Sequence, residues 1–149
     1  MKQTKEAVIF DIDGTLSDNE HRVHHLQGEK KDWDAFFAAQ PLDTPRQDVL
    51  DVLCMYERDG CFIFLLTGRG EEWRDMTEAW LAKYNIHYDV LVMRPLGDRT
   101  DDDILKLEQI KAWQAEGFNI VGLFDDRMRI CEAARNHGIT VFQMARGEF

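Results

Sequence analysis

The hydrophobic pattern of this chain consists of five short apolar runs separated by longer, mixed stretches. A continuous run of aliphatic, β-branched and aromatic residues predicts a strand buried on both faces, as in a parallel sheet covered by helices. The runs are residues 7–10, 61–67, 88–93, 119–124 and 139–142. Apolar residues at helical spacing predict a helix over 47–58, and further helices are predicted at 71–83, 101–116 and 128–137. This alternation predicts an α/β fold with an open, mostly parallel five-stranded sheet and helices on both faces.

The segment between the first strand and the first long helix is short and mixed. Residues 17–22 are predicted as a polar loop, and residues 32–37 resemble a short capped helix with an aromatic face. The aromatic side chains of that helix could stack a nucleic-acid base or pack over the sheet, and packing is the preferred interpretation. They are Trp33, Phe36 and Phe37. Because the segment is too small for a second domain, we predict one domain over 1–149 with a cap-like insert at about 17–45.

The helix predicted at 101–116 has a recognisable start. Thr100 is the expected N-cap, with Asp103 three positions later in the place of a capping-box carboxylate. Gly117 marks the expected end.

Two carboxylates follow the first strand directly. Asp11 and Asp13 point the same way in extended chain, and Gly14 permits a sharp turn after them. An EF-hand calcium loop also begins with this spacing, but it requires glycine at its sixth position and a carboxylate at its twelfth. Leu16 and Arg22 occupy those positions, so that interpretation is rejected. Ligands of open α/β sheets bind at the carboxyl ends of strands, where these two acids are expected.

Asp125 and Asp126 follow the fourth predicted strand. Placed beside Asp11, they would form a group of hard oxygen ligands suited to Mg²⁺, whereas Zn²⁺ lacks a His/Cys grouping with ligand spacing. The alternative is that both are ordinary acids at the start of a helix.

Two further residues have side chains suited to binding phosphate. Thr67 offers a hydroxyl and neighbouring backbone N–H groups at a strand-to-helix turn, where anions bind readily, although a plain turn is equally open. Lys106 is a candidate anion ligand, although it could simply pair with Asp102 one helical turn earlier.

Composition narrows the function classes. A formal net charge of −10 argues against a surface that tracks long nucleic acid, but permits recognition of a strand end by a few arginines. Cys54, Cys61 and Cys131 form no Cys-x-x-Cys pair and are expected to be buried free thiols. With no signal peptide or membrane span in the sequence, we expect a cytoplasmic protein without membrane contact.

The order Asp-x-Asp-Gly-Thr at 11–15, strand-end Thr67, helical Lys106 and Asp125-Asp126 resembles the haloacid dehalogenase-type phosphohydrolase superfamily. A narrower similarity, to the 3′-phosphatase domain of bacteriophage polynucleotide kinase/phosphatase, rests on four segments. They are residues 67–69, 94–106, 125–127 and 146–149. The sequence contains no P-loop, so the resemblance implies a free-standing phosphatase with a Rossmann-like fold and a minimal cap.

The resemblance implies a role for each motif residue. Asp11 would attack phosphorus and carry an aspartyl phosphate, while Asp13 would act as general acid and then base. Thr67 and Lys106 would bind the transferring oxygens, and Asp102 would aim the lysine. The residues implied for Mg²⁺ are Asp11, Asp125, Asp126 and, through its backbone carbonyl, Asp13.

The resemblance also implies a substrate. Arg22, Arg69 and the adjacent Gly68 are the expected contacts with the rest of it, since a guanidinium can grip phosphate in two places. A nearly uncapped site stays open to a polymer end, so the predicted substrates are 3′-phosphorylated ends of DNA or RNA, with 2′,3′-cyclic ends as an extension. Two alternatives stay open: a phosphatase of small phosphomonoesters such as nucleotides, and a signalling module in which the aspartyl phosphate persists.

Overall fold

The structure, a computed structural model, describes residues 5–147 of the chain. Five parallel strands form the main sheet, and short 3₁₀ helices (η) and α-helices connect them. The strands of this sheet are β1 (Glu6–Phe10), β4 (Phe62–Gly70), β5 (Val90–Arg94), β6 (Asn119–Arg127) and β7 (Val141–Gly147). The helices around it are α3 (Gln47–Arg58), η3 (Glu71–Trp73), α4 (Arg74–Lys83), α5 (Asp102–Ala115) and α6 (Met128–Asn136).

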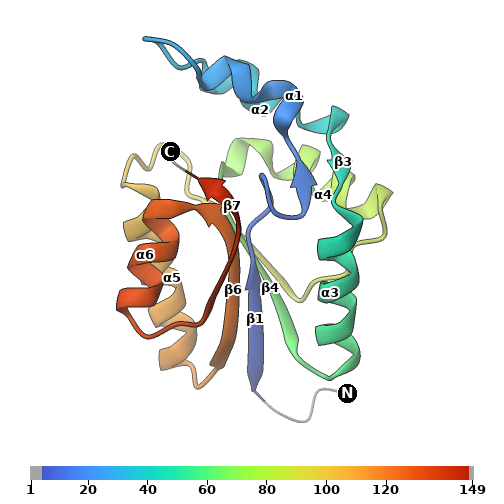
Figure 1. Cartoon of the computed structure of the whole chain (residues 1–149), viewed down its shortest axis with the longest axis vertical. Helices are drawn as coiled ribbons and strands as arrows, with labels where there is room; N and C mark the ends of the chain where they lie inside the picture. Colours follow the sequence, from blue (N-terminus) through green and yellow to red (C-terminus); the bar gives the residue numbers. More distant parts are fainter. Residues whose placement is uncertain (1–4, 148–149) are drawn as a thin grey trace.

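The strand order is β5-β4-β1-β6-β7, which places β1 at the centre (Figure 1). All four side chains of 7–10 have no exposed surface, because successive residues of β1 face opposite cores. Val8 and Phe10 pack with residues of α3 and α4, while Ala7 and Ile9 pack with residues of α5 and α6. The predicted doubly covered parallel sheet is confirmed.

A small insert lies at the carboxyl ends of the strands (Figure 1). It is closed by a two-stranded antiparallel pair, β2 (Ser17–Asp18) and β3 (Thr44–Pro45). The short helices between them are α1 (Glu20–Val23), η1 (His24–Leu26), α2 (Trp33–Ala38) and η2 (Gln40–Leu42). The Asp32 carboxylate accepts a hydrogen bond from the Ala35 N–H at 3.0 Å, so the expected capped helix is present. The predicted loop at 17–22 is wrong, since it holds β2 and the start of α1.

Other local predictions are also corrected. Asp101, not Thr100, is the N-cap of α5, and its side chain makes no capping hydrogen bond. The Thr100 N–H donates to the Asp98 carboxylate at 2.8 Å. Strands β4 and β6 run three residues beyond their expected ends, since Gly70 pairs with Arg94 and Arg127 with Gly147.

The sequence also led to expectations for the three cysteines and for the last residues of the chain. Cys61 and Cys131 are buried and form no disulfide, as expected, whereas Cys54 is exposed. Glu148 and Phe149, from the closing segment of the sequence similarity, lie outside the described residues. Among residues 5–147, no helix combines the length and hydropathy needed to cross a bilayer.

Candidate active site

Three buried carboxylates meet where β1 and β6 end. Phe10 pairs with Phe124 across these adjacent parallel strands, so Asp11 and Asp125 come next to each other at the same edge of the sheet. One carboxylate oxygen each from Asp11, Asp125 and Asp126 lies within 4.8 Å of the others. The acids that the sequence placed at two separate strand ends therefore form a single cluster.

Lys106 joins this cluster from α5. Its ammonium group donates to Asp11 Oδ1 at 3.0 Å and to Asp125 Oδ2 at 2.8 Å, and the side chain is almost fully buried. Burial opposes the charged form of Lys106, but the attraction of Asp11 and Asp125 outweighs it and raises its pKa. Lys106 is therefore a permanently charged group at the cluster.

One lysine does not neutralise three acids. Burial and the neighbouring Asp125 raise the pKa of Asp11 well above its usual range, and they raise that of Asp126 to about 7. In addition, Asp126 Oδ1 is buried without a hydrogen-bond partner among the described residues. An oxygen cluster with excess negative charge and an orphaned acceptor fits a hard divalent cation.

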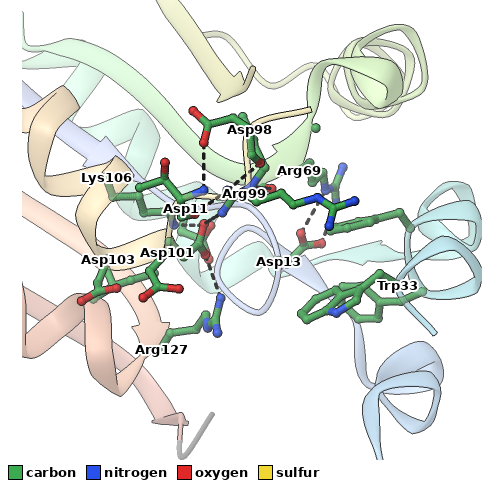
Figure 2. A pocket seen from close by; sticks show the side chains of 18 of the residues that line it. Asp11, Asp13, Trp33, Arg69, Asp98, Arg99, Asp101, Asp103, Lys106 and Arg127 are labelled. Atoms are coloured by element: carbon green, nitrogen blue, oxygen red, sulfur yellow. Dashed lines mark hydrogen bonds and ion pairs between the residues drawn. The ribbon is translucent and has the colours of Figure 1, made fainter. Parts of the chain in front are cut away.

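Asp13 lies outside the three-acid cluster and is held by two arginines, of which Arg69 is labelled in Figure 2. Arg69 donates from Nε to Asp13 Oδ2 at 3.0 Å and from Nη2 to Oδ1 at 2.7 Å, and Arg22 Nη2 donates to Oδ1 as well. Burial raises the pKa of Asp13, but the two guanidinium groups outweigh burial and hold that pKa far below its usual range. Asp11 and Asp13 thus occupy electrostatically opposite environments.

The two arginines expected to contact substrate point into the protein. Arg22 is fully buried and does not line the cavity described below, so in place of a substrate contact it binds Asp13 and Asp43. Arg69 lines that cavity but is 1% exposed, and its remaining donors go to Gln40 Oε1 at 2.6 Å and Thr77 Oγ1 at 3.1 Å. Both arginines therefore position Asp13.

Sequence reasoning missed the residues that hold these arginines. Asp43, the carboxylate that receives Arg22, is 1% exposed, and its backbone carbonyl also accepts from Trp80 Nε1. Gln40 and Thr77 are likewise fully buried polar residues. The two prolines near Asp43 in the sequence do not indicate that this residue is buried. Its burial goes with the contact to Arg22, which exists only once the insert has folded.

The expected contact between Asp102 and Lys106, which are one helical turn apart, is absent from the described residues, where Asp102 has other partners. Its Oδ1 accepts from Arg94 Nη2 at 2.8 Å, and its Oδ2 accepts from Arg127 Nη1 at 2.7 Å. Gly68 makes room for this arrangement, since a Cβ on Gly68 would lie 2.6 Å from Asp102 Oδ1. Asp102 therefore bonds to the last residues of β5 and β6 and lies against the carboxyl-terminal part of β4. Of its two arginine partners, neither was predicted as a site residue.

Thr67 is buried in β4, and its Oγ1 accepts a hydrogen bond from the Arg69 N–H at 3.1 Å. Its hydroxyl proton is not used by that bond and is free to be donated. Thr67 and Lys106 both line a smaller cavity of about 220 Å³ beside the main one.

The main cavity has a volume of about 750 Å³ and extends from the acids to the insert (Figure 2). Asp11, Asp13 and Lys106 line its inner part, and aromatic residues of the insert line another wall. Trp33 lies on the opposite side of Asp13 from Lys106 (Figure 2). The aromatic helix α2 thus forms part of the cavity wall.

A Rossmann-like sheet that brings an acid pair, a lysine and a second acid pair to one edge defines a phosphomonoester hydrolase of the haloacid dehalogenase type. Solved structures share the fold, including a class C acid phosphatase from Bacillus anthracis, with a TM-score of 0.70 at 16% identity over 99% of this chain and 69% of that one. The chain belongs to the family "Polynucleotide kinase PNKP phosphatase domain", whose model matches residues 5–149.

Two relatives are larger proteins. A chain of the Pnkp1/Rnl/Hen1 RNA repair complex is 32% identical with a TM-score of 0.82, over 97% of this chain and 43% of that one. A viral protein named "Putative bifunctional polynucleotide kinase/RNA ligase", from Autographa californica nuclear polyhedrosis virus, is 30% identical over 94% of this chain. The present chain spans 19% of that viral protein and less than half of the chain in the RNA repair complex.

Proposed function

We propose that this chain is a Mg²⁺-dependent phosphatase that removes 3′-phosphate from the ends of nucleic acids through an aspartyl phosphate on Asp11. The observation that carries the proposal is the convergence of Asp11, Lys106 and the Asp125–Asp126 pair, of which all but Asp125 line one open cavity. Membership of the polynucleotide kinase phosphatase family supports a nucleic-acid end as the substrate. The same chemistry extends to 2′,3′-cyclic ends.

The reaction has two steps. A carboxylate oxygen of Asp11 attacks phosphorus and the bond to the 3′-oxygen breaks, while Asp13 donates a proton to that leaving oxygen. Water then attacks the aspartyl phosphate, Asp13 accepts a proton from this water, and inorganic phosphate leaves. Lys106 and Thr67 donate to the phosphoryl oxygens, where charge develops.

The acid cluster would hold the cation through Asp11, Asp125, Asp126 and the backbone carbonyl of Asp13. When bound, Mg²⁺ offsets the repulsion among these carboxylates and the charge of the phosphoryl group. The metal-free site favours a proton on Asp11 and a charge on Asp13, the reverse of what the first step needs. The charges of a bound cation and of the phosphate dianion would both favour the protonation states that the first step needs. Positive charge favours ionised Asp11, and negative charge favours protonated Asp13.

A phosphate-release panel tests the proposal. The panel compares a 3′-phosphorylated oligonucleotide, the matching 5′-phosphorylated oligonucleotide and nucleoside monophosphates, each with Mg²⁺ and with chelator. We expect release from the 3′-phosphorylated end with Mg²⁺ only, and none by Asp11→Asn. Faster turnover of monophosphates by orders of magnitude would establish the small-substrate alternative. A phosphoenzyme that persists for minutes without turnover would establish the signalling alternative.

A further inference from the structure

One cation of the main cavity has no partner among residues 5–147. Arg99 lies on the connection between β5 and α5, and its exposed side chain lines the cavity. Within the described part of the chain it makes no hydrogen bond or ion pair. Every other basic side chain that lines the cavity is paired with a carboxylate. They are Arg69, Arg94, Lys106, Arg127 and Arg129.

The carboxylates near Arg99 in the sequence are already engaged. Asp98 accepts from the Thr100 N–H at 2.8 Å, and Arg129 lies 3.5 Å from Asp101 and 3.1 Å from Asp103. Among the described residues that line the cavity, the guanidinium of Arg99 is therefore the one cation that remains available for an anion from outside. A guanidinium in this position suits a phosphate, which it can contact through two N–H groups.

A second feature of the cavity wall is the aromatic surface of the insert. Trp33 is 42% exposed although it lines the cavity, and its ring stacks on Phe37 with centroids 5.9 Å apart. It also meets Phe36 edge to face at 5.9 Å, and the Arg22 guanidinium lies 4.3 Å from the centroid of Phe36. Arg22 in turn binds Asp13, so the position of the aromatic surface is linked to the proposed general acid.

We propose that Trp33 and Arg99 form a binding subsite for the end of the strand, an inference that rests on the proposed function. Trp33 stacks on the base of the nucleotide that carries the 3′-phosphate. Arg99 binds the phosphodiester that joins this nucleotide to the preceding one. A nucleoside 3′-monophosphate has the base but lacks the diester, and an abasic 3′-phosphate lacks the base. The subsite therefore selects a strand end over a monomer through two separable contacts.

Each of the two contacts should change the affinity for the strand end by a measurable factor. A charge-assisted hydrogen bond to phosphate and a base stacked on an aromatic ring are each sufficient for about a tenfold change in affinity. The aromatic surface is preformed by Phe36 and Phe37, so stacking orders little additional structure.

The experiment measures kcat/KM for a 3′-phosphorylated dinucleotide, the same dinucleotide with a neutral methylphosphonate linkage, the nucleoside 3′-monophosphate and a dinucleotide with an abasic 3′ end. For wild type, we expect the neutral linkage to cost about tenfold. In Arg99→Ala the natural dinucleotide should lose the same factor, and the neutral linkage should bring no further loss. Arg58→Ala, which removes an exposed arginine at the end of α3, is the matched control. It should keep the wild-type ratio of kcat/KM between the natural and the neutral linkage.

Trp33 is tested in the same way. Trp33→Ala should lower kcat/KM about tenfold for substrates with a terminal base but not change the ratio between the two linkages, and Trp33→Phe should restore most of the loss. Met55→Ala, at an exposed apolar residue of α3, is the control. If Trp33→Ala lowered kcat/KM equally for substrates with and without a terminal base, Trp33 would have a structural role and the stacking contact would be overturned.

A binding measurement separates this subsite from the proposed chemistry. Asp11→Asn is mixed with a 3′-phosphorylated dinucleotide that carries 2-aminopurine as its terminal base, whose fluorescence is quenched by stacking. We expect quenching that is lost when Trp33→Ala is added and weakened by the neutral linkage. Absence of quenching overturns the subsite even if phosphate is released in the panel above. Quenching without any phosphate release in that panel supports the subsite while the phosphatase proposal fails.

Discussion

Arg22 and Asp43 form a two-point ion pair that is wholly buried at the base of the insert. Arg22 Nε lies 2.8 Å from Asp43 Oδ1 and Nη2 lies 2.6 Å from Oδ2, with both side chains at 0% exposure. The same Nη2 donates to Asp13. Because Arg22 belongs to α1 and Asp43 immediately precedes β3, the pair joins the two ends of the insert and fixes the proposed general acid.

Asp43→Ala is therefore expected to lower the free energy of unfolding by about 3–5 kcal/mol, since it leaves the Arg22 guanidinium buried with an incomplete set of partners. Urea unfolding followed by circular dichroism measures the change. Asp59→Ala, at an exposed acid that follows α3, is the control and should stay within about 0.5 kcal/mol of wild type. A cost for Asp43→Ala no larger than that of the control would mean that the pair is not a structural link.

Asp11→Asn and Asp13→Asn should differ in their dependence on the leaving group. Asp11→Asn removes the nucleophile, so both a 3′-phosphorylated oligonucleotide and p-nitrophenyl phosphate should show no turnover. Asp13→Asn should slow the oligonucleotide by about 10²–10⁴-fold, since its leaving alkoxide needs a proton, but should retain a burst of nitrophenolate, a leaving group that needs none. Rapid-mixing absorbance records the burst. Turnover by Asp11→Asn would contradict the covalent mechanism.

The sheet and the acid cluster could be predicted because both follow from short-range rules. The continuous apolar run at 7–10 requires two covered faces, and adjacent parallel strands must bring Asp11 and Asp125 to the same edge. The expected placement of Lys106 beside the acids followed only from the family resemblance, and the structure brings it to both of them.

The direction of the arginines could not be read from the sequence. Arg22 and Arg69 lie in polar surroundings along the chain, and their burial depends on Asp43, Gln40 and Thr77, which come from other elements. Such contacts form only when the insert packs on α4, which no local pattern encodes. A sequence pattern therefore identified which arginines matter but not what they touch.

Gly68→Ala should disturb Asp102 through a steric contact alone. The added Cβ would lie 2.6 Å from Asp102 Oδ1 and 2.8 Å from Oδ2, both of which are held by arginines. We expect a cost of about 1–3 kcal/mol in the free energy of unfolding, the usual range for overpacking. The control is the same substitution in an Asp102→Ala background, where the clashing atoms are absent and the added cost should fall below about 1 kcal/mol. Equal costs in both backgrounds would show that Asp102 does not impose the glycine.

The acid cluster should make the metal-free protein less stable as pH rises. The pKa of Asp126 is raised to about 7 by burial and by Asp125, whereas an unfolded aspartate titrates near 3.9. Between these two values the folded state binds more protons than the unfolded state, so stability falls as pH increases and levels off above about 7. The raised pKa of Asp11 acts in the same direction. With chelator present, Tm should therefore drop between pH 5 and about 7.5.

Mg²⁺ should remove this slope, because a cation replaces the protons that relieve the repulsion among Asp11, Asp125 and Asp126. Thermal unfolding at several pH values, with Mg²⁺ and with chelator, provides the test, and Asp126→Asn is the internal control. That variant cannot gain the charge, so its metal-free Tm should depend less on pH and its Tm should rise less when Mg²⁺ is added. A metal-free Tm that is independent of pH in the wild type would show that the three carboxylates are not short of positive charge, and would remove the electrostatic reason for a cation at this edge of the sheet.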